Sequence, residues 1–89
     1  MLERSRELVR VGAYGLTSHA LEELESDDLA GEDLEQILLG GRIVERQRDA
    51  ETGDHKYVFF GTCFSGAPAY AVVKFAHPER LLVVTVFLA

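Results

Sequence analysis

The sequence lacks the features that identify most metal proteins and many classes of enzyme. Cys63 is its only cysteine, so an internal disulfide and a cysteine-based zinc site are both excluded. A glycine-rich phosphate loop and a nucleophile elbow are absent, and the three histidines lack a spacing such as His-x-x-x-His. No apolar stretch approaches the roughly 20 residues of a membrane span, and Met1–Val11 alternates charge where a signal peptide has an apolar core. We therefore expect a cytoplasmic protein with no metal, no cofactor and no membrane attachment.

What the sequence does contain suits one small folded domain. Its 89 residues are 47% hydrophobic, which supplies a core for a single domain over residues 1–89 and argues against disorder. The formal net charge is −6. Such a charge repels phosphate backbones unless the basic side chains gather on one face, so RNA is disfavoured as a partner.

The first half of the sequence predicts three helices. A weak amphipathic pattern covers Leu2–Val11. Thr17 suits the N-cap of a second helix, because apolar residues lie at the two positions of a hydrophobic staple, and Ser26–Asp28 ends that helix. A third helix begins near Gly31 with acidic residues in its first turn. It ends at Gly40–Gly41, where paired glycines permit a left-handed exit.

From Arg42 onward the apolar residues alternate with a period of two, as they do in half-buried strands. Four such runs are separated by stretches rich in turn residues: Arg42–Arg48, His55–Phe64, Ala69–Ala76 and Leu81–Leu88. Because the connections are short, neighbouring strands are expected to be antiparallel. The predicted fold is α+β, with two to three N-terminal helices packed on one face of a four-stranded antiparallel β-meander.

The lengths of the loops set the predicted register. We expect even-length loops centred on Gly66 and Pro78. One face, which would receive the helices, then consists of these apolar residues: Val58, Phe60, Phe64, Ala71, Val73, Phe75, Leu82, Val84 and Val86. The opposite face holds Tyr57, Phe59, Tyr70, Val72, Lys74, Val83, Thr85 and Phe87, joined by Val44, Arg46 and Arg48 of the first strand. An odd-length loop would change this assignment.

The second face has two interpretations. An apolar sheet face on a small protein is usually covered by a helix, a second subunit or a partner, which predicts a protein partner or a homodimer. The partner-binding residues would be Phe59, Tyr70, Val72, Thr85 and Phe87. Alternatively, basic and hydroxyl side chains would surround a shallow concavity and bind a phosphate. Those residues are Arg46, Arg48, Tyr57, Lys74 and Thr85.

His19 is the histidine best placed for chemistry. It falls in the first turn of the second helix, where the helix dipole disfavours the imidazolium, so a neutral ring able to accept a proton is expected there. The alternative is a local hydrogen bond or packing against the edge of the sheet. The acidic residues that follow are interpreted as solvated surface: Glu22, Glu23, Glu25, Asp27 and Asp28.

Several short motifs occur in a familiar order. They are Thr17-Ser18-His19-Ala20, Glu32-Asp33, Gly41-Arg42-Ile43-Val44-Glu45, Gly66-Ala67-Pro68-Ala69-Tyr70-Ala71-Val72-Val73 and Val84-Thr85-Val86-Phe87. Each is weak alone, but their order and spacing over about residues 14–87 resemble the bacterial domain-of-unknown-function family 4258.

The resemblance implies both a fold and an activity. That family is similar to the small toxins of bacterial toxin–antitoxin pairs, of the RelE and BrnT type, whose helices pack on a small antiparallel sheet. It therefore implies an RNA-cleaving toxin held in check by an antitoxin. In such toxins basic and tyrosine side chains activate the 2′-hydroxyl and steady the phosphate. By that resemblance the catalytic residues would be drawn from His19, Arg46, Tyr57 and Lys74.

The chain departs from this family at two positions. Family members usually carry arginine four residues after the histidine, and often another four residues later, whereas this chain has Glu23 and Asp27. Each change replaces a phosphate-binding cation by an anion near His19. Enzyme activity is therefore left open, and two functions are expected. One is a toxin-like protein with RNA cleavage kept or lost, and the other is a non-catalytic module that binds a partner or itself through the second sheet face.

Overall fold

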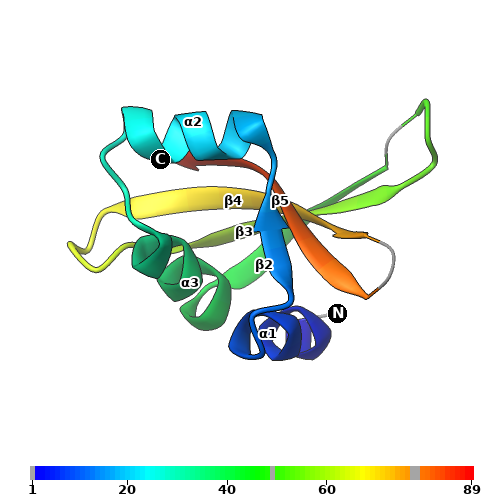
Figure 1. Cartoon of the computed structure of the whole chain (residues 1–89), viewed down its shortest axis with the longest axis horizontal. Helices are drawn as coiled ribbons and strands as arrows, with labels where there is room; N and C mark the ends of the chain where they lie inside the picture. The colour runs from blue at the N-terminus through cyan, green and yellow to red at the C-terminus, as the bar shows by residue number, and fades with distance from the viewer. Residues whose placement is uncertain (1, 49, 77–78) are drawn as a thin grey trace.

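The computed structural model describes residues 2–48, 50–76 and 79–89, and within them the chain forms three helices and five strands (Figure 1). The helices are α1 (Leu2–Arg10), α2 (Ser18–Ser26) and α3 (Gly31–Gly40). The strands are β1 (Tyr14–Leu16), β2 (Arg42–Arg48), β3 (His55–Thr62), β4 (Pro68–Ala76) and β5 (Arg80–Leu88). The structure thus confirms the α+β class, the three helices and the four strands of the second half.

The sheet contains one strand more than the sequence predicted. Its order is β1-β5-β4-β3-β2, so β2 to β5 form an antiparallel meander while β1 pairs in parallel with β5. The prediction of a purely antiparallel, four-stranded sheet was therefore wrong. β1 has only three residues, too few to show an alternating pattern, and its partner lies at the other end of the chain.

The register between β3 and β4 also differs from the prediction. Thr62 pairs with Pro68, so five residues form the loop instead of an even number. The Cys63 amide donates to the Ala67 carbonyl at 2.9 Å and closes this loop. Gly66 lies at a φ of +90°, a left-handed conformation that glycine adopts without steric strain. Because side chains alternate between faces, the odd loop exchanges the faces of β3 relative to those of β4.

Between β4 and β5 a bulge changes, partway along β5, which face of the sheet each side chain occupies. The predicted loop at Pro78 lies outside the described residues, but Ala76 pairs with Arg80, which leaves an odd number of residues between them. The register then shifts at Val84, opposite the Val72–Val73 step. Residues of β5 before this bulge lie on the face opposite to the predicted one, whereas those after it lie as predicted.

These changes of register move three side chains into the core. Phe59 and Val83 have no exposed surface and Tyr57 is only 4% exposed, and all three belong to the main core cluster. Their predicted place on the face away from the helices was wrong. Four residues that were predicted to face the helices, on β4 and at the end of β5, do so: Ala71, Val73, Phe75 and Val86.

Conversely, several residues predicted for the core lie elsewhere. Phe60 and Leu82 face away from the core cluster, opposite Tyr70 and Lys74 respectively. Val58 is buried but does not belong to that cluster, and it pairs with Val72, which was predicted for the second face. Phe64 lies in the β3–β4 loop with 68% of its surface exposed. Val84 occupies the bulge described above.

The three helices share one core but lie at different places along the sheet. α1 and α3 lie together on one side, whereas α2 lies along the β5 edge (Figure 1). Thr17 places α2 there, because its hydroxyl accepts the Ala20 amide as the predicted N-cap and donates to the Val84 carbonyl. The Thr17 amide also donates to the Val83 carbonyl at 3.0 Å. The buried residues of α2, Ala20 and Leu24, belong to the same core cluster as those of α1 and α3, so all three helices bury apolar side chains against the same face of the sheet.

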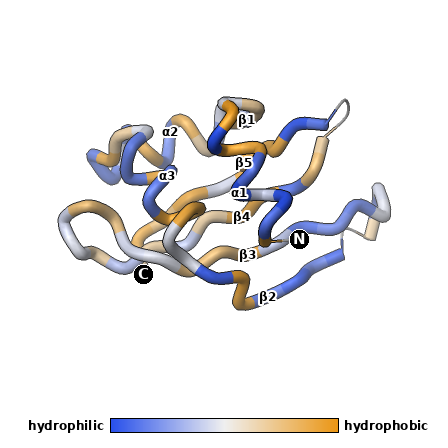
Figure 2. Tube along the Cα trace, turned by 90° about the horizontal axis from the view of Figure 1, so that it is seen from below, coloured by the Kyte–Doolittle hydropathy of each residue, from blue (hydrophilic) through white to orange (hydrophobic). Residues whose placement is uncertain are grey.

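At the opposite edge β2 is largely hydrophilic (Figure 2). Its charged residues protect an edge strand whose unpaired backbone groups would otherwise recruit another strand. Where β2 begins, α3 approaches the sheet closely. A Cβ atom added at Gly41 would lie 2.4 Å from the Ile37 carbonyl oxygen, and one added at Gly61 would lie 2.9 Å from the same atom. Two glycines therefore permit this contact between helix and strand.

Candidate functional site

The sheet surface that faces away from the core cluster is the candidate site, and we call it the open face. It consists of side chains from three central strands: Val58, Phe60, Tyr70, Val72, Lys74, Leu82, Thr85 and Phe87. None of them belongs to the main core cluster. Phe87 is 41% exposed, and Phe60 and Tyr70 are partly exposed. The open face thus offers aromatic and aliphatic surface to a partner.

Three aromatic side chains cross this face in a line that we call the aromatic row. Phe60, Tyr70 and Phe87 are direct pairing partners on β3, β4 and β5. The ring centroids of Phe60 and Tyr70 are 5.0 Å apart, and those of Tyr70 and Phe87 are 5.2 Å apart with 24° between the planes. Such cross-strand aromatic pairs stabilise a sheet and give its surface a fixed shape.

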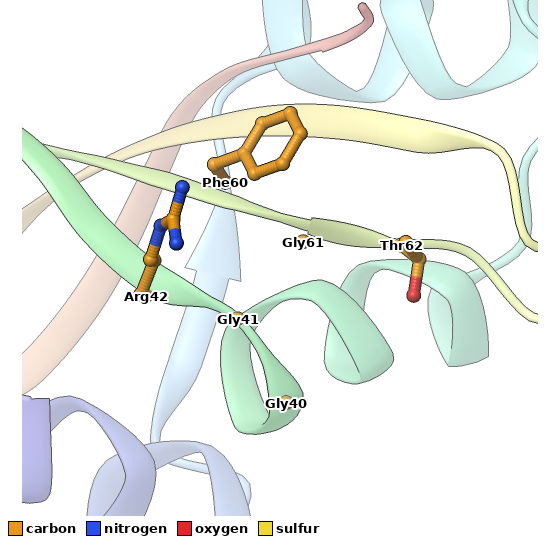
Figure 3. A pocket seen from close by; sticks show the side chains of 6 residues that line it. All are labelled: Gly40, Gly41, Arg42, Phe60, Gly61 and Thr62. Atoms are coloured by element: carbon orange, nitrogen blue, oxygen red, sulfur yellow. The ribbon is translucent and has the colours of Figure 1, made fainter.

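A basic side chain lies at the first end of the aromatic row. Arg42 of β2 pairs with Phe60, and its guanidinium carbon lies 5.9 Å from the centre of that ring, a cation–π contact. Figure 3 shows the guanidinium beside the ring. A hollow of about 280 Å³ opens here, lined by Gly40, Gly41, Arg42, Phe60, Gly61 and Thr62. Within the described residues Arg42 makes no ion pair, so its charge is available to a partner.

Acidic side chains lie at the other end. A hollow of about 410 Å³ beside Phe87 is lined by residues of α2 and its C-cap: His19, Glu22, Glu23, Ser26 and Asp27. Glu22 is exposed and Asp27 is half-buried. Neither carboxylate has an ion-pair partner within the described part of the chain. The aromatic row therefore runs from one uncompensated cation to uncompensated anions.

The charge of the whole chain is also unevenly distributed, between an acidic helical segment and a nearly neutral sheet. Residues 17–41, which contain α2 and α3, carry eight acidic residues and no lysine or arginine. Residues 42–89, which contain β2 to β5, carry six basic and five acidic residues. The net charge of −6 therefore comes from the helical segment, and the sheet itself is close to neutral.

Glu23, one of the two departures from the family pattern, has a clear structural role. Its carboxylate accepts the Val86 amide at 3.0 Å and also accepts a hydrogen bond from the Thr85 hydroxyl. These donors lie on β5 beyond the end of β1, so β4 pairs with them on one side but β1 does not reach them on the other. Glu23 thus supplies the hydrogen-bond acceptor that a neighbouring strand would supply at this edge, and it holds α2 to the sheet. An arginine at this position could not accept these two hydrogen bonds, because its guanidinium group has only donors.

The four residues predicted for catalysis do not converge on one site. Tyr57 lies in the core, and Arg46 lies over its ring at 5.7 Å. Lys74 lies on the open face, 3.6 Å from the carboxylate of Asp54. His19 is exposed at the start of α2, with its Nε2 atom 3.3 Å from Glu23. The structure brings Arg46 and Tyr57 together but places Lys74 and His19 elsewhere.

Four of the five residues predicted to bind a partner do share the open face: Tyr70, Val72, Thr85 and Phe87. Phe59 does not, because it is fully buried beneath the helices. Its neighbour Phe60 takes that place. The alternating pattern of the sequence did not place Phe60 or Arg42 on this face, but an odd-length loop at Gly66 would have placed Phe60 there.

Cys63 provides no nucleophile in this arrangement. The thiol is 3% exposed, and burial raises its pKa, with the nearby Asp33 carboxylate acting in the same direction. A protonated, buried thiol is unreactive. Among the described residues no three histidine, cysteine or acidic side chains are placed to hold a metal ion. No helix in the described ranges is long and apolar enough to cross a membrane.

Comparison with known proteins gives one match. The sequence model of a family described as "Domain of unknown function (DUF4258)" matches residues 16–88. No curated protein and no solved structure matches the chain. The matched range includes α2, α3 and β2 to β5, and therefore the whole open face.

Proposed function

The chain belongs to the DUF4258 family, and we propose that it is a non-catalytic binding module that contacts its partner through the open face. The aromatic row carries this proposal. Phe60, Tyr70 and Phe87 form a continuous apolar surface with a fixed shape. Aromatic side chains are enriched at the centres of protein interfaces because they bury a large area at a low cost in conformational entropy.

The placement of the predicted catalytic residues also favours binding over chemistry. General acid–base catalysis needs both groups within hydrogen-bond reach of one reacting atom. His19 lies at the β5 edge and Lys74 on the open face, and each is close to a carboxylate. Tyr57 is 4% exposed. A substrate phosphate would therefore reach these residues only one at a time.

The diffusion of a fluorescently labelled chain tests this proposal, measured both in buffer and in an extract of host cells. We expect the wild-type chain to diffuse more slowly than a 9.9-kDa monomer in at least one of these media. Phe87→Asp places a charge on the aromatic row and should restore monomer-like diffusion. Phe64→Asp is the matched control, because Phe64 is more exposed than Phe87 but lies in the β3–β4 loop. Monomer-like diffusion of the wild type in both media would contradict the proposal.

RNA cleavage by a toxin-like protein is a second candidate. The resemblance to RNA-cleaving toxins supports it, together with the position of Lys74 on the same face as Tyr70. It predicts growth arrest on expression and RNA cleavage that is lost with Lys74→Ala and retained with Arg10→Ala, which changes an exposed residue of α1. Unimpaired growth with intact RNA would leave binding as the function.

A further inference from the structure

The two ends of the aromatic row carry opposite charges, and this asymmetry indicates what covers the open face. Arg42 lies at the β2 end, over the ring of Phe60. Glu22 and Asp27 lie at the β5 end, in the hollow beside Phe87. A surface of this kind is complementary to itself when a second copy faces it, turned by 180° about an axis that lies in the interface and runs parallel to the strands.

We propose that the occupant of the open face is a second copy of this chain, which forms a two-fold symmetric dimer. This inference rests on the proposed function, since it names the partner of the same face. In the dimer the aromatic rows of the two copies pack against each other. Arg42 of each copy meets the Glu22 and Asp27 carboxylates of the other, so the same pair of contacts forms twice, as two-fold symmetry requires.

The spacing of the strands permits this arrangement. Arg42, Phe60, Tyr70 and Phe87 are successive pairing partners on four adjacent strands. Adjacent strands lie about 4.8 Å apart, so the row is roughly 14 Å long. A two-fold axis between Phe60 and Tyr70 therefore superposes the Arg42 end of one copy on the Phe87 end of the other. α2, which lies beside Phe87, supplies the carboxylates there.

Single-stranded RNA fits the same surface less well. Bases bind proteins by stacking on exposed aromatic faces, but the rings of Tyr70 and Phe87 already stack on each other. Lys74, the cation beside the row, is paired with Asp54. The carboxylates at the β5 end would also repel a phosphate backbone.

A partner with charge of a single sign also fits poorly. A basic segment would be attracted to Glu22 but repelled by Arg42. An acidic segment would be attracted to Arg42 but repelled by Glu22. A second copy offers both charges in the complementary order. The molecule measures 34 × 25 × 22 Å, so the whole of one face is only about as large as the roughly 800 Å² per partner of a standard interface. We therefore expect a dissociation constant on the order of 10 μM, weaker than that of most obligate dimers.

Sedimentation equilibrium of charge-exchange variants tests the inference. We expect Arg42→Glu and Glu22→Arg each to weaken the dimer at least tenfold, because each brings like charges together. The double variant should recover an affinity within about threefold of the wild type, because the ion pair is then restored in reverse. Glu32→Arg, a change at an exposed carboxylate of α3, should leave the affinity unchanged. Circular dichroism of each variant establishes that it is folded.

Three results would overturn the inference. The first is a wild-type chain that stays monomeric up to millimolar concentration. The second is a dimer that neither Arg42→Glu nor Phe87→Asp weakens. The third is tight binding of a single-stranded oligouridylate that is lost with Phe87→Asp, which would make RNA the occupant. A chain that is monomeric in buffer but diffuses slowly in cell extract, with sensitivity to Phe87→Asp, would overturn the dimer and retain the binding module.

Discussion

The ring of Tyr70 stacks on the ring of Phe87 across β4 and β5, with centroids 5.2 Å apart and 24° between the planes. The two residues are direct pairing partners, so the contact follows from the register after the bulge at Val84. Without that bulge, Phe87 would point into the core and the aromatic row would end at Tyr70. A single extra residue in β5 therefore determines the length of the row.

We expect this contact to stabilise the chain as well as to shape its surface. In a double-mutant cycle with Tyr70→Leu and Phe87→Leu, the coupling free energy should be about 0.5–1.5 kcal/mol, as for other aromatic pairs. Urea denaturation at high dilution measures it without a contribution from association. If the two free-energy changes add to within about 0.3 kcal/mol, the rings do not interact in solution.

Glu23 should contribute to stability through the β5 edge. In Glu23→Ala the Val86 amide and the Thr85 hydroxyl lose their common acceptor. The loss should lower the free energy of unfolding by about 1–3 kcal/mol. Glu25→Ala, a change at a nearby exposed residue of α2, should alter it by less than about 0.5 kcal/mol. Equal effects of the two substitutions in denaturant titrations would show that Glu23 does not hold α2 to the sheet.

The contact between α3 and β3 should not tolerate side chains at Gly41 or Gly61. A Cβ at Gly41 would lie 2.4 Å from the Ile37 carbonyl oxygen and 2.5 Å from that of Phe60. Gly41→Ala and Gly61→Ala should each lower the free energy of unfolding by about 1–3 kcal/mol through displacement of the backbone. Gly40→Ala is the control, because a Cβ there has no atom within 4 Å and alanine favours a helix by about 1 kcal/mol. Thermal unfolding of the three variants compares them, and a Gly61→Ala chain as stable as the wild type would contradict the close approach.

Tyr14 links β1 to α3 and should titrate at unusually high pH. Its hydroxyl donates to the Glu35 carboxylate, and burial together with this bond raises the pKa of Tyr14 from 10.0 to about 12. Because the fold favours the neutral phenol, the resulting stability is fully present below pH 10 and is lost as the pH rises from about 10 to about 12. Glu35→Gln should lower this pKa and reduce the loss of stability in that range.

Tyrosinate absorbance in a pH titration measures this directly. The chain has three tyrosines, and Tyr14→Phe identifies the transition that belongs to Tyr14. A Tyr14 transition near pH 10 that is the same in wild type and Glu35→Gln would rule out the link between β1 and α3.

The sequence predicted the elements of the fold better than their faces. Thr17 was identified as an N-cap because capping depends on local hydrogen bonds. Gly40–Gly41 was identified as a helix end, but the predicted left-handed exit was wrong, because Gly41 is extended with a φ of −87°. The missing Cβ of Gly41 instead permits the close approach to Ile37 and Phe60. The faces depend on whether each loop and bulge contains an odd or an even number of residues. Nothing local to Phe59 or Phe60 distinguishes them, so the five-residue loop after Thr62 decided which of them became core.

The candidate site shows the same limit. Tyr70, Val72, Thr85 and Phe87 were assigned to one face correctly because they lie on β4 and beyond the bulge in β5. Arg42 was not recognised, since its position over Phe60 depends on the pairing of β2 with β3. Glu23 was interpreted as solvated surface. Its role at the β5 edge required knowledge that β1 ends at Leu16 and leaves the Val86 amide unpaired.

The most direct test of the central claim is a dilution series of amide NMR spectra. If the open face is the binding surface, lowering the concentration should shift the signals of Arg42, Phe60, Tyr70, Phe87 and Glu22. The signals of α1 should stay fixed, because that helix lies on the other side of the sheet. Shifts confined to α1 and α3, or a spectrum that does not change with concentration in buffer or on addition of cell extract, would contradict the assignment of function to this face.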